Sequence, residues 1–528
     1  MRRALKAVAG LMGVVLATAC AAEGAEKAPV PGASAGLPQA GLDLTAAEAE
    51  CPAVKPPGDS SARQVRGMWI SSVYGGDWPG DPEAPVAEKK ARYRAMLDSA
   101  KAKGLNTVFM QIRPAGDAFY PSSYEPWSVW LTGAPGKDPG WNPLRFLIDE
   151  AHARDLEFHA WFNPYRVGED DDRGKLAPGS PARRNPGWAV KYGKYLWYDP
   201  GLPQVQDLAV NAVMEVVKKY DIDGVHFDDY FYPYPTGQDF PDEKTYRKYG
   251  GGFANKGDWR RDNVNKLVKR LSSDIKEAKP WVKFGISPFG IWRNKSDDPR
   301  GSDTHGLDSY AEIYGDTRKW VKEGWLDYVL PQLYWAIGDP RADYATLVAW
   351  WSELVRGTGV QLLIGQAGYR MKEQAFAKKP DEISRHLTLN RRYPAVRGDV
   401  HFSAADYVSD RRGFVSVLMR EHYRTPALIP PSKGGERPAA PGGLKARKTK
   451  EGVALSWTGG ATSYAVYRSE VKGGACAEVK ASDLLTSTRG ESLVDTTARR
   501  GKTYTYRVTA LDRTHQESGP SRAVVITP

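Results

Sequence analysis

Two adjacent carboxylates, Asp228 and Asp229, stand where a predicted strand ends and an aromatic, proline-broken loop begins. The strand starts at Asp221, and successive side chains point to opposite faces, so His226 and Asp228 share one face. Carboxyl pairs can cleave a glycosidic bond when one group stays protonated near neutral pH and the other acts as base or nucleophile. We predict Asp228 as the principal catalytic carboxylate and Asp229 as its partner or a substrate ligand. The alternative is that Asp228 caps the loop and Asp229 is solvated.

The elements around this stretch alternate strand with helix from residue 65 to residue 422. Strands are expected at 65–74, 106–113, 157–165, 221–228, 283–289, 327–335, 361–370 and 399–404. Helices are expected at 87–103, 143–154, 203–220, 258–279, 317–323, 344–356, 380–392 and 410–422, and the stretch 168–200 is expected to be a long polar loop. This alternation predicts an α/β fold, a (β/α)8 TIM barrel with its site at the carboxyl ends of the strands. A doubly wound open sheet is the alternative, but no glycine-rich phosphate loop follows the first strand.

Other polar and aromatic residues stand at the predicted strand ends, where they would face a substrate. The predicted substrate-binding residues are Arg113, Asp117, Asn163, Tyr165, Gln332, Tyr334 and Trp335. An ion pair inside the barrel mouth is the alternative for Arg113, and Asp117 and Glu125 remain candidates for the second catalytic group. We expect His226 to form hydrogen bonds within the barrel rather than to act directly in catalysis.

Six ordered motifs together resemble one protein family. They are Arg66–Trp69, Val108–Pro114, Asp117–Ser122, Ala160–Arg166, Asp223–Tyr230 and Pro331–Trp335. Over residues 63–425 the chain resembles the glycosyl-hydrolase-like 10 family, which includes bacterial envelope lipoproteins that hydrolyse peptide-free peptidoglycan strands. The resemblance implies a TIM barrel and a glycosidase.

The fourth strand has a second resemblance, to chitinase-like enzymes. Its Asp-Gly-x-His-x-Asp spacing is similar to theirs, but Tyr230 stands where they carry a catalytic Glu. Their mechanism is therefore not transferred directly. An N-acetyl sugar could still act as its own nucleophile, with one acid and an orienting group such as Gln332, Tyr334 or Asn163.

The N-terminus predicts export. Residues 1–19 combine a basic start with an apolar run too short to span a bilayer, as in a signal peptide. The small residues before Cys20 resemble a lipobox, although Ala17 stands where Leu is usual, so we expect lipidation of Cys20; plain secretion is the alternative. Residues 20–62 are rich in Ala, Gly, Pro and Glu and are expected to form a flexible tether. Cys51 and Cys476 would then remain as a possible disulfide pair.

In the C-terminal part of the chain, the strand–helix alternation gives way to short segments of alternating apolar and polar residues. A Pro/Gly/Lys-rich linker is expected at 426–441, followed by alternating segments in residues 442–528. Trp457 near the start and Tyr504 and Tyr506 near the end resemble a fibronectin type III module, a small all-β sandwich. Such a module more often spaces or docks than catalyses.

Charge and residue spacing narrow the function class. The net charge of +11 on an exported chain suggests an anionic environment such as a cell wall or lipid headgroups. The signal peptide and the lack of a concentrated basic helix argue against nucleic acid, and no His or Cys spacing predicts a metal or cofactor. We therefore predict a lipid-anchored glycoside hydrolase of the cell envelope that acts on cell-wall glycan, at the outer face of the cytoplasmic membrane or at the outer membrane. A non-catalytic carbohydrate-binding protein and a hydrolase of another polysaccharide are the alternatives, and the oligomeric state stays open.

Overall fold

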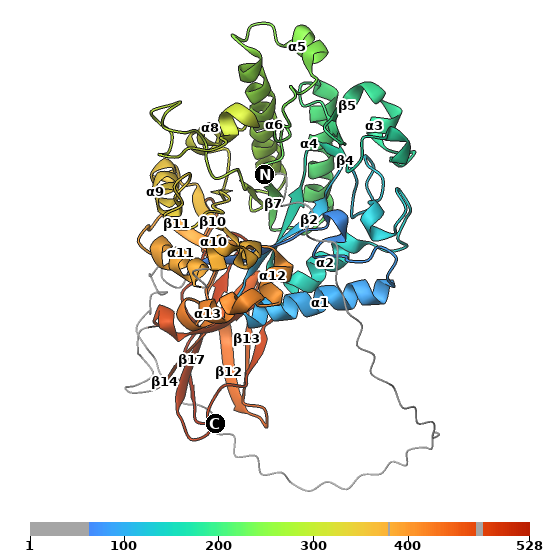
Figure 1. The fold of residues 1–528 in the computed structure, drawn as a ribbon. Coiled ribbons are helices and arrows are strands. Elements are labelled where there is room, and N and C mark those ends of the chain that lie inside the picture. The colour runs from blue at the N-terminus through green and yellow to red at the C-terminus, as the bar shows by residue number, and fades with distance from the viewer. Residues whose placement is uncertain (1–62, 378–380, 471–478) are drawn as a thin grey trace, which may run out of the picture. The chain divides into compact units, whose positions relative to one another are not determined.

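A closed barrel of eight parallel strands forms the centre of the protein, in a computed structural model that describes residues 63–377, 381–470 and 479–528 (Figure 1). The strands follow one another around the barrel in chain order, and the last pairs with the first. They are β1 (Val65–Ile70), β2 (Thr107–Arg113), β3 (Glu157–Phe162), β7 (Gly224–Phe227), β8 (Lys283–Ile286), β9 (Tyr328–Val329), β10 (Gln361–Ala367) and β11 (Val396–Phe402). The predicted TIM barrel is confirmed.

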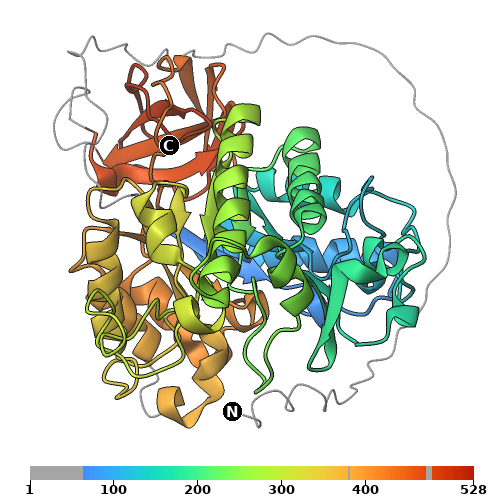
Figure 2. The ribbon, with the colours of Figure 1, turned by 90° about the horizontal axis from the view of Figure 1, so that it is seen from above.

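A helix follows each barrel strand before the next strand begins. These helices are α1 (Val86–Ala102), α2 (Pro143–His152), α4 (Pro203–Lys219), α6 (Lys256–Ala278), α8 (Thr317–Lys322), α9 (Tyr344–Val355), α11 (Glu382–Asn390) and α13 (Phe414–Glu421). Shorter helices lie in the loops: α3 (Pro181–Arg184), α5 (Glu243–Tyr249), α7 (Ser309–Glu312), α10 (Gln374–Ala377) and α12 (Ala404–Val408). Figure 2, a view from above, shows α4 and α6 in green running alongside each other, and the two helices are in contact.

The helix α4 shows why the sequence folds this way. It starts with Pro203, whose missing N–H is not needed in the first turn, and ends with Lys218 and Lys219, whose charges suit the C-terminal dipole. Val205, Val213 and other apolar residues at helical spacing are buried against the barrel. The barrel strands are buried on both faces, so their apolar residues run on rather than alternate.

The stretch 168–200, expected to be a polar loop, contains regular structure, so that prediction was wrong. An antiparallel sheet of β4 (Arg166–Gly168), β6 (Tyr195–Tyr198) and β5 (Ala189–Tyr192) lies between β3 and α4. Its strands have three or four residues each and stand among glycines, prolines and charged residues, so the stretch has the composition of a loop. The sheet carries Arg166 and Trp197 towards the barrel's carboxyl end.

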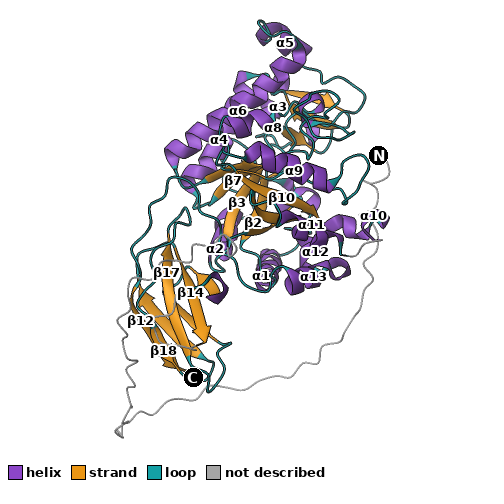
Figure 3. Ribbon diagram, turned by 90° about the vertical axis from the view of Figure 1, so that its left-hand side faces the viewer, coloured by secondary structure: helices purple, strands orange, loops and turns teal. Residues whose placement is uncertain are grey.

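The C-terminal residues form the predicted β-sandwich (Figure 3). One sheet has the order β12 (Gly442–Lys448), β13 (Val453–Thr458), β16 (Ser492–Asp495); the other has β15 (Leu484–Thr488), β14 (Ser463–Glu470), β17 (Tyr504–Leu511), β18 (Val524–Ile526). Trp457, Tyr464 and Tyr506 lie in its core. Tyr504 accepts a hydrogen bond from the backbone N of Arg499, 3.2 Å away, as expected for a tyrosine corner.

Four predictions concern residues outside the described ranges. These are the signal peptide, the tether, lipidation of Cys20 and a bond between Cys51 and Cys476. Among the described residues, no helix combines the length and the apolarity needed to cross a membrane.

Candidate active site

The Asp228 carboxylate lies directly after β7 and is 5% exposed. Its Oδ2 accepts hydrogen bonds from the indole Nε1 of Trp161 at 3.1 Å and from Nδ2 of Asn163 at 2.6 Å. Its Oδ1 accepts from the backbone N of Tyr230 at 3.0 Å. Both lone pairs of Oδ2 are therefore occupied, and a proton on Asp228 would sit on Oδ1.

The amide of Asn163 is held in one orientation by a second row of hydrogen bonds. Its Oδ1 accepts from Nε2 of Gln111 at 2.7 Å, which leaves Nδ2 to face Asp228. Gln111 is oriented in turn because its Oε1 accepts from the backbone N of Ser72 and of Val73, at 2.9 and 3.1 Å. Residues at the carboxyl ends of β1, β2 and β3 thus position one side chain against Asp228.

The Asp229 carboxylate is 3% exposed and has different partners. Its Oδ2 accepts from the hydroxyl of Tyr234, and its Oδ1 accepts from Nε2 of Gln332 at 3.1 Å. Gln332, which follows β9, also donates to the backbone O of Ser287 at 3.0 Å, which fixes its amide. Each oxygen of Asp229 therefore accepts one side-chain hydrogen bond.

The pKa values of the two adjacent carboxyl groups are both raised. Burial, and after it the neighbouring charge of Asp229, raise the pKa of Asp228 to about 7. Burial also raises the pKa of Asp229, against the opposing effect of the hydrogen bonds from Tyr234 and Gln332. Such a pair can hold a proton near neutral pH and so offers both a general acid and a carboxylate.

Aromatic rings and one cation surround the pair. The guanidinium of Arg166 lies 4.6 Å from the centre of the Tyr230 ring and 5.7 Å from that of Trp197. The rings of Tyr230 and Trp197 are stacked, with centroids 6.4 Å apart. The charge of Arg166 acts to lower the pKa of Asp228, so it limits the rise caused by burial.

Arg113 is not placed to bind a substrate, so the structure does not support that prediction. It is 1% exposed, and its guanidinium binds both oxygens of Glu125 as well as the backbone O of Asn163. Both members of this ion pair are fully engaged inside the protein. The structure shows the alternative, an ion pair in the barrel mouth, and the same contacts leave Glu125 unavailable as the second catalytic group.

The other predicted residues divide into two groups. Tyr165 is fully buried and Asp117 is 9% exposed, with its carboxylate accepting from the backbone N of Ala115 at 3.1 Å, so the structure brings neither to an open surface. Burial raises the pKa of Asp117 to about 6. Tyr334 and Trp335 are partly exposed in the loop after β9 and pack edge-on against Tyr369 and Phe289. Asn163 and Gln332 donate directly to the carboxylates, and Tyr334 lies near enough to interact with both of their charges.

Several residues that surround the two carboxyl groups were not predicted as site residues. Trp161 and Gln111 were noted only as parts of motifs, although they hold Asp228 directly and through Asn163. Arg166 stood in a quoted motif, and Tyr234 belongs to the tyrosine-rich loop that begins at Tyr230. A strand end followed by aromatic residues was the available signal, but no pattern in the sequence shows which tyrosine turns back to Asp229.

The fold and these residues define a TIM barrel with a buried pair of carboxyl groups at the carboxyl ends of its strands, the place where such barrels carry their active sites. The chain belongs to the glycosyl hydrolase-like 10 family, whose sequence model matches residues 64–382. The predicted family is therefore confirmed.

Individual relatives agree with this assignment. The chain is 46% identical over 482 residues to glycosyl hydrolase YngK of Bacillus subtilis, a match that covers 88% of this chain and 93% of that protein. It is 41% identical over 381 residues to glycosyl hydrolase DigH of Escherichia coli, covering 67% of this chain and 86% of that protein. Among solved structures, it is similar to the PgaB (BpsB) glycoside hydrolase domain from Bordetella bronchiseptica, at 14% identity and a TM-score of 0.45, over 67% of this chain and 98% of that domain.

The assignment of Arg113 to a buried ion pair can be tested by removing one or both partners. We expect Arg113→Met to lower the free energy of unfolding by about 3–5 kcal/mol, because it leaves the Glu125 carboxylate buried without its partner. The double variant Arg113→Met/Glu125→Leu should recover most of this loss. Thermal unfolding of the three proteins measures it, and an unchanged melting temperature for Arg113→Met would contradict the structural role.

Proposed function

We propose that the protein hydrolyses glycosidic bonds in cell-wall glycan, with Asp228 and Asp229 as its catalytic carboxylates. The observation that carries the proposal is the buried pair of consecutive carboxylates at the carboxyl ends of β7 and its neighbours, with the pKa of Asp228 raised to about 7. A group with this pKa can be a protonated acid at neutral pH and a base once it has given its proton away.

The arrangement favours a substrate-assisted mechanism. In the ordinary mechanisms two carboxyl groups flank the scissile bond. Here the two come from adjacent residues of one strand end, and the described alternatives, Glu125 and Asp117, are engaged elsewhere. In the proposed mechanism the acetamido oxygen of an N-acetyl sugar attacks the anomeric carbon, while Asp228 gives its proton to the leaving oxygen. Asp229, held by Tyr234 and Gln332, orients the acetamido group, and Asp228 then activates the water that opens the intermediate.

A wall glycan suits this chemistry and the surface of the site. Peptidoglycan strands consist of N-acetyl sugars, and Tyr334 and Trp335 provide partly exposed aromatic rings on which sugar rings can stack. The names of YngK and DigH describe glycosyl hydrolases, and the net charge of +11 suits an anionic wall. We propose peptide-free peptidoglycan strands as the substrate.

We also propose that the protein works in the cell envelope, attached to a membrane through a lipid on Cys20. The support is in the sequence alone: a signal-like residue range 1–19, small residues before Cys20 and a tether-like composition over 20–62.

The catalytic assignment predicts the effect of removing each carboxylate. Asp228→Asn should lower the rate of product release from peptide-stripped glycan strands by about 10²–10⁴-fold, because the amide cannot give a proton to the leaving oxygen. Asp229→Asn should lower it too, and mainly for substrates that carry an acetamido group. Chromatography with mass spectrometry measures the reducing-end fragments, and Glu353→Gln, on an exposed position of α9, is the matched control.

Equal release by wild type and Asp228→Asn would remove Asp228 from the mechanism. No release by any of these proteins, with binding to the strands retained, would favour a non-catalytic carbohydrate-binding protein. Release from another polysaccharide alone would contradict the proposed substrate.

The raised pKa of Asp228 predicts the pH dependence of the reaction. Since the acid must be protonated, kcat/KM should fall as the pH rises through about 7. In Asp229→Asn the neighbouring negative charge is gone, so the pKa of Asp228 should fall and the alkaline limb of the remaining activity should move to lower pH. An alkaline limb at the same pH in both proteins would argue against the coupling of the two groups.

The lipid anchor predicts the behaviour of a cysteine variant. In a bacterial host, wild type should incorporate radiolabelled palmitate and sediment with membranes, whereas Cys20→Ala should do neither. Label retained in Cys20→Ala would place the lipid elsewhere, and an unlabelled soluble wild type would favour plain secretion.

A further inference from the structure

A row of hydrogen-bonded side chains runs through the inside of the barrel, from its carboxyl end to its amino end. His226 Nδ1 lies 3.1 Å from the hydroxyl of Tyr328, which lies 2.9 Å from Nδ1 of His159. Nε2 of His159 lies 3.2 Å from Oε2 of Glu157. All four residues are at most 4% exposed, and they come from β7, β9 and β3.

The direction of these hydrogen bonds follows from one donor. The indole N–H of Trp69 points to Nε2 of His226 at 3.0 Å, and an indole can only donate, so this nitrogen accepts. His226 must then carry its proton on Nδ1 and donate to Tyr328. In the neutral form of His159, the Tyr328 hydroxyl donates onward to Nδ1 of His159, and the Nε2–H of His159 donates to Glu157. Burial lowers the pKa of His226 well below its ordinary value, in agreement with this neutral form.

Two glycines make room for the rings of the row. A Cβ at Gly224 would lie 2.5 Å from the His159 ring, and a Cβ at Gly285 would lie 2.2 Å from the Tyr328 ring. Any larger residue at either position would displace the ring beside it. The strands β7 and β8 are therefore built around the row, which is not a chance contact of polar side chains.

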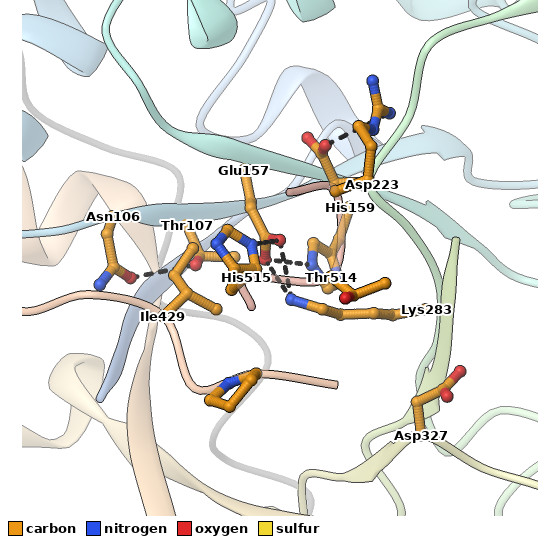
Figure 4. A network of polar contacts seen from close by, with 12 residues as sticks. Asn106, Thr107, Glu157, His159, Asp223, Lys283, Asp327, Ile429, Thr514 and His515 are labelled. Atoms are coloured by element: carbon orange, nitrogen blue, oxygen red, sulfur yellow. Dashed lines mark hydrogen bonds and ion pairs between the residues drawn. The ribbon is translucent and has the colours of Figure 1, made fainter. Parts of the chain in front are cut away.

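At the amino end of the barrel, the row ends on a charge cluster that includes the sandwich. Figure 4 shows His159, Lys283 and His515 converging on Glu157. Nζ of Lys283 lies 2.7 Å from Oε1 of Glu157, and Nε2 of His515, from the segment between β17 and β18, lies 2.5 Å from the same oxygen. Although burial opposes ionisation, these two charges hold the pKa of Glu157 well below its usual range.

Further ion pairs bind the sandwich at the same place. Arg513 reaches Asp221 at 2.7 Å, and Arg489 reaches Asp223 at 3.3 Å. A small cavity of about 30 Å³ lies between the two surfaces and is lined by residues of both, among them Glu157 and His515.

At the carboxyl end of the barrel, the row contacts residues that hold the two carboxylates: Ser287, which fixes Gln332, and Trp161. Nε2 of His226 lies 3.0 Å from the hydroxyl of Ser287, whose backbone O accepts from the same Gln332 amide that donates to Asp229. The Trp161 ring, which donates to Asp228, lies edge-on to the His226 ring with centroids 6.4 Å apart.

We propose that the C-terminal sandwich is a positioning element of the active site. Its His515 completes the charge cluster on Glu157, and the oriented hydrogen bonds from Glu157 to His226 hold the side chains that support Asp228 and Asp229. The effect on rate rests on the proposed hydrolase function, whereas the effect on the geometry of the site does not. His515, Glu157, His159 and Tyr328 are positioning residues, because they lie inside the barrel or at its amino end and act on the carboxyl pair only through other side chains.

The test compares full-length variants along the row with a matched control. Tyr328→Phe removes the central hydroxyl, and His515→Leu removes the sandwich's contribution, while His515→Gln keeps an N–H donor. The control is Tyr423→Phe, another buried tyrosine whose hydroxyl lies 3.2 Å from a histidine, His401, outside the row. The measurements are the ¹⁵N side-chain shifts of His159 and His226, the side-chain amide signals of Asn163 and Gln332, kcat and KM.

We expect Tyr328→Phe to move His226 and His159 away from single tautomers, to shift the Gln332 amide signal and to lower kcat about tenfold with KM nearly unchanged. His515→Leu should act in the same direction with a smaller effect, His515→Gln should restore most of it, and Tyr423→Phe should change neither tautomers nor kcat.

Unchanged amide signals of Asn163 and Gln332 in both Tyr328→Phe and His515→Leu would overturn the proposal, as would an equal effect of Tyr423→Phe. If wild type cleaves no glycan, the proposed hydrolase function fails, but the amide and tautomer signals still decide whether the sandwich positions the site. If His515→Leu leaves the signals unchanged while Tyr328→Phe moves them, the sandwich has no positioning role.

Discussion

Burial of two adjacent carboxylates is the constraint on which the rest of this structure depends. Asp228 and Asp229 are almost without solvent, so every charge-stabilising contact must come from the protein. Donors from two strand ends supply these contacts: Trp161 and Asn163 at the end of β3 for Asp228, and Gln332 after β9 for Asp229. The closed barrel is what brings these strand ends together, because parallel strands all place their carboxyl ends at one rim.

Each donor is itself held by a further hydrogen bond, so the site continues well into the barrel. Gln111 orients Asn163, and the backbone of Ser287 orients Gln332. Below them, His226, Tyr328 and His159 fill the barrel interior with a polar row that ends on Glu157. The barrel thus joins the carboxyl pair at one end to a contact with the sandwich at the other, and at both ends buried charged groups have hydrogen-bond or ion-pair partners.

Much of this architecture could be predicted from the sequence. The eight strand–helix units have lengths and apolar runs that identify them individually, and Asp228 and Asp229 stand out as charges at the end of a buried strand. The small sheet that carries Arg166 was missed, because its short strands stand among glycines, prolines and charged residues, which give the stretch the composition of a loop. Arg113 was predicted to bind substrate, since a strand-end arginine shows its charge in the sequence but not its partner, Glu125, twelve residues along the chain.

By itself, the sequence determined the fold class, the family and the position of the two carboxylates at a strand end. Local periodicity and short motifs encode these features directly. Only the tertiary structure decided which polar residues face the carboxylates, which are used up in buried ion pairs, and that His515 of the sandwich meets Glu157 of the barrel. The physical reason is that a hydrogen bond or an ion pair is set by distances between side chains from remote elements. Those distances exist only after barrel closure and domain contact have placed the elements in space.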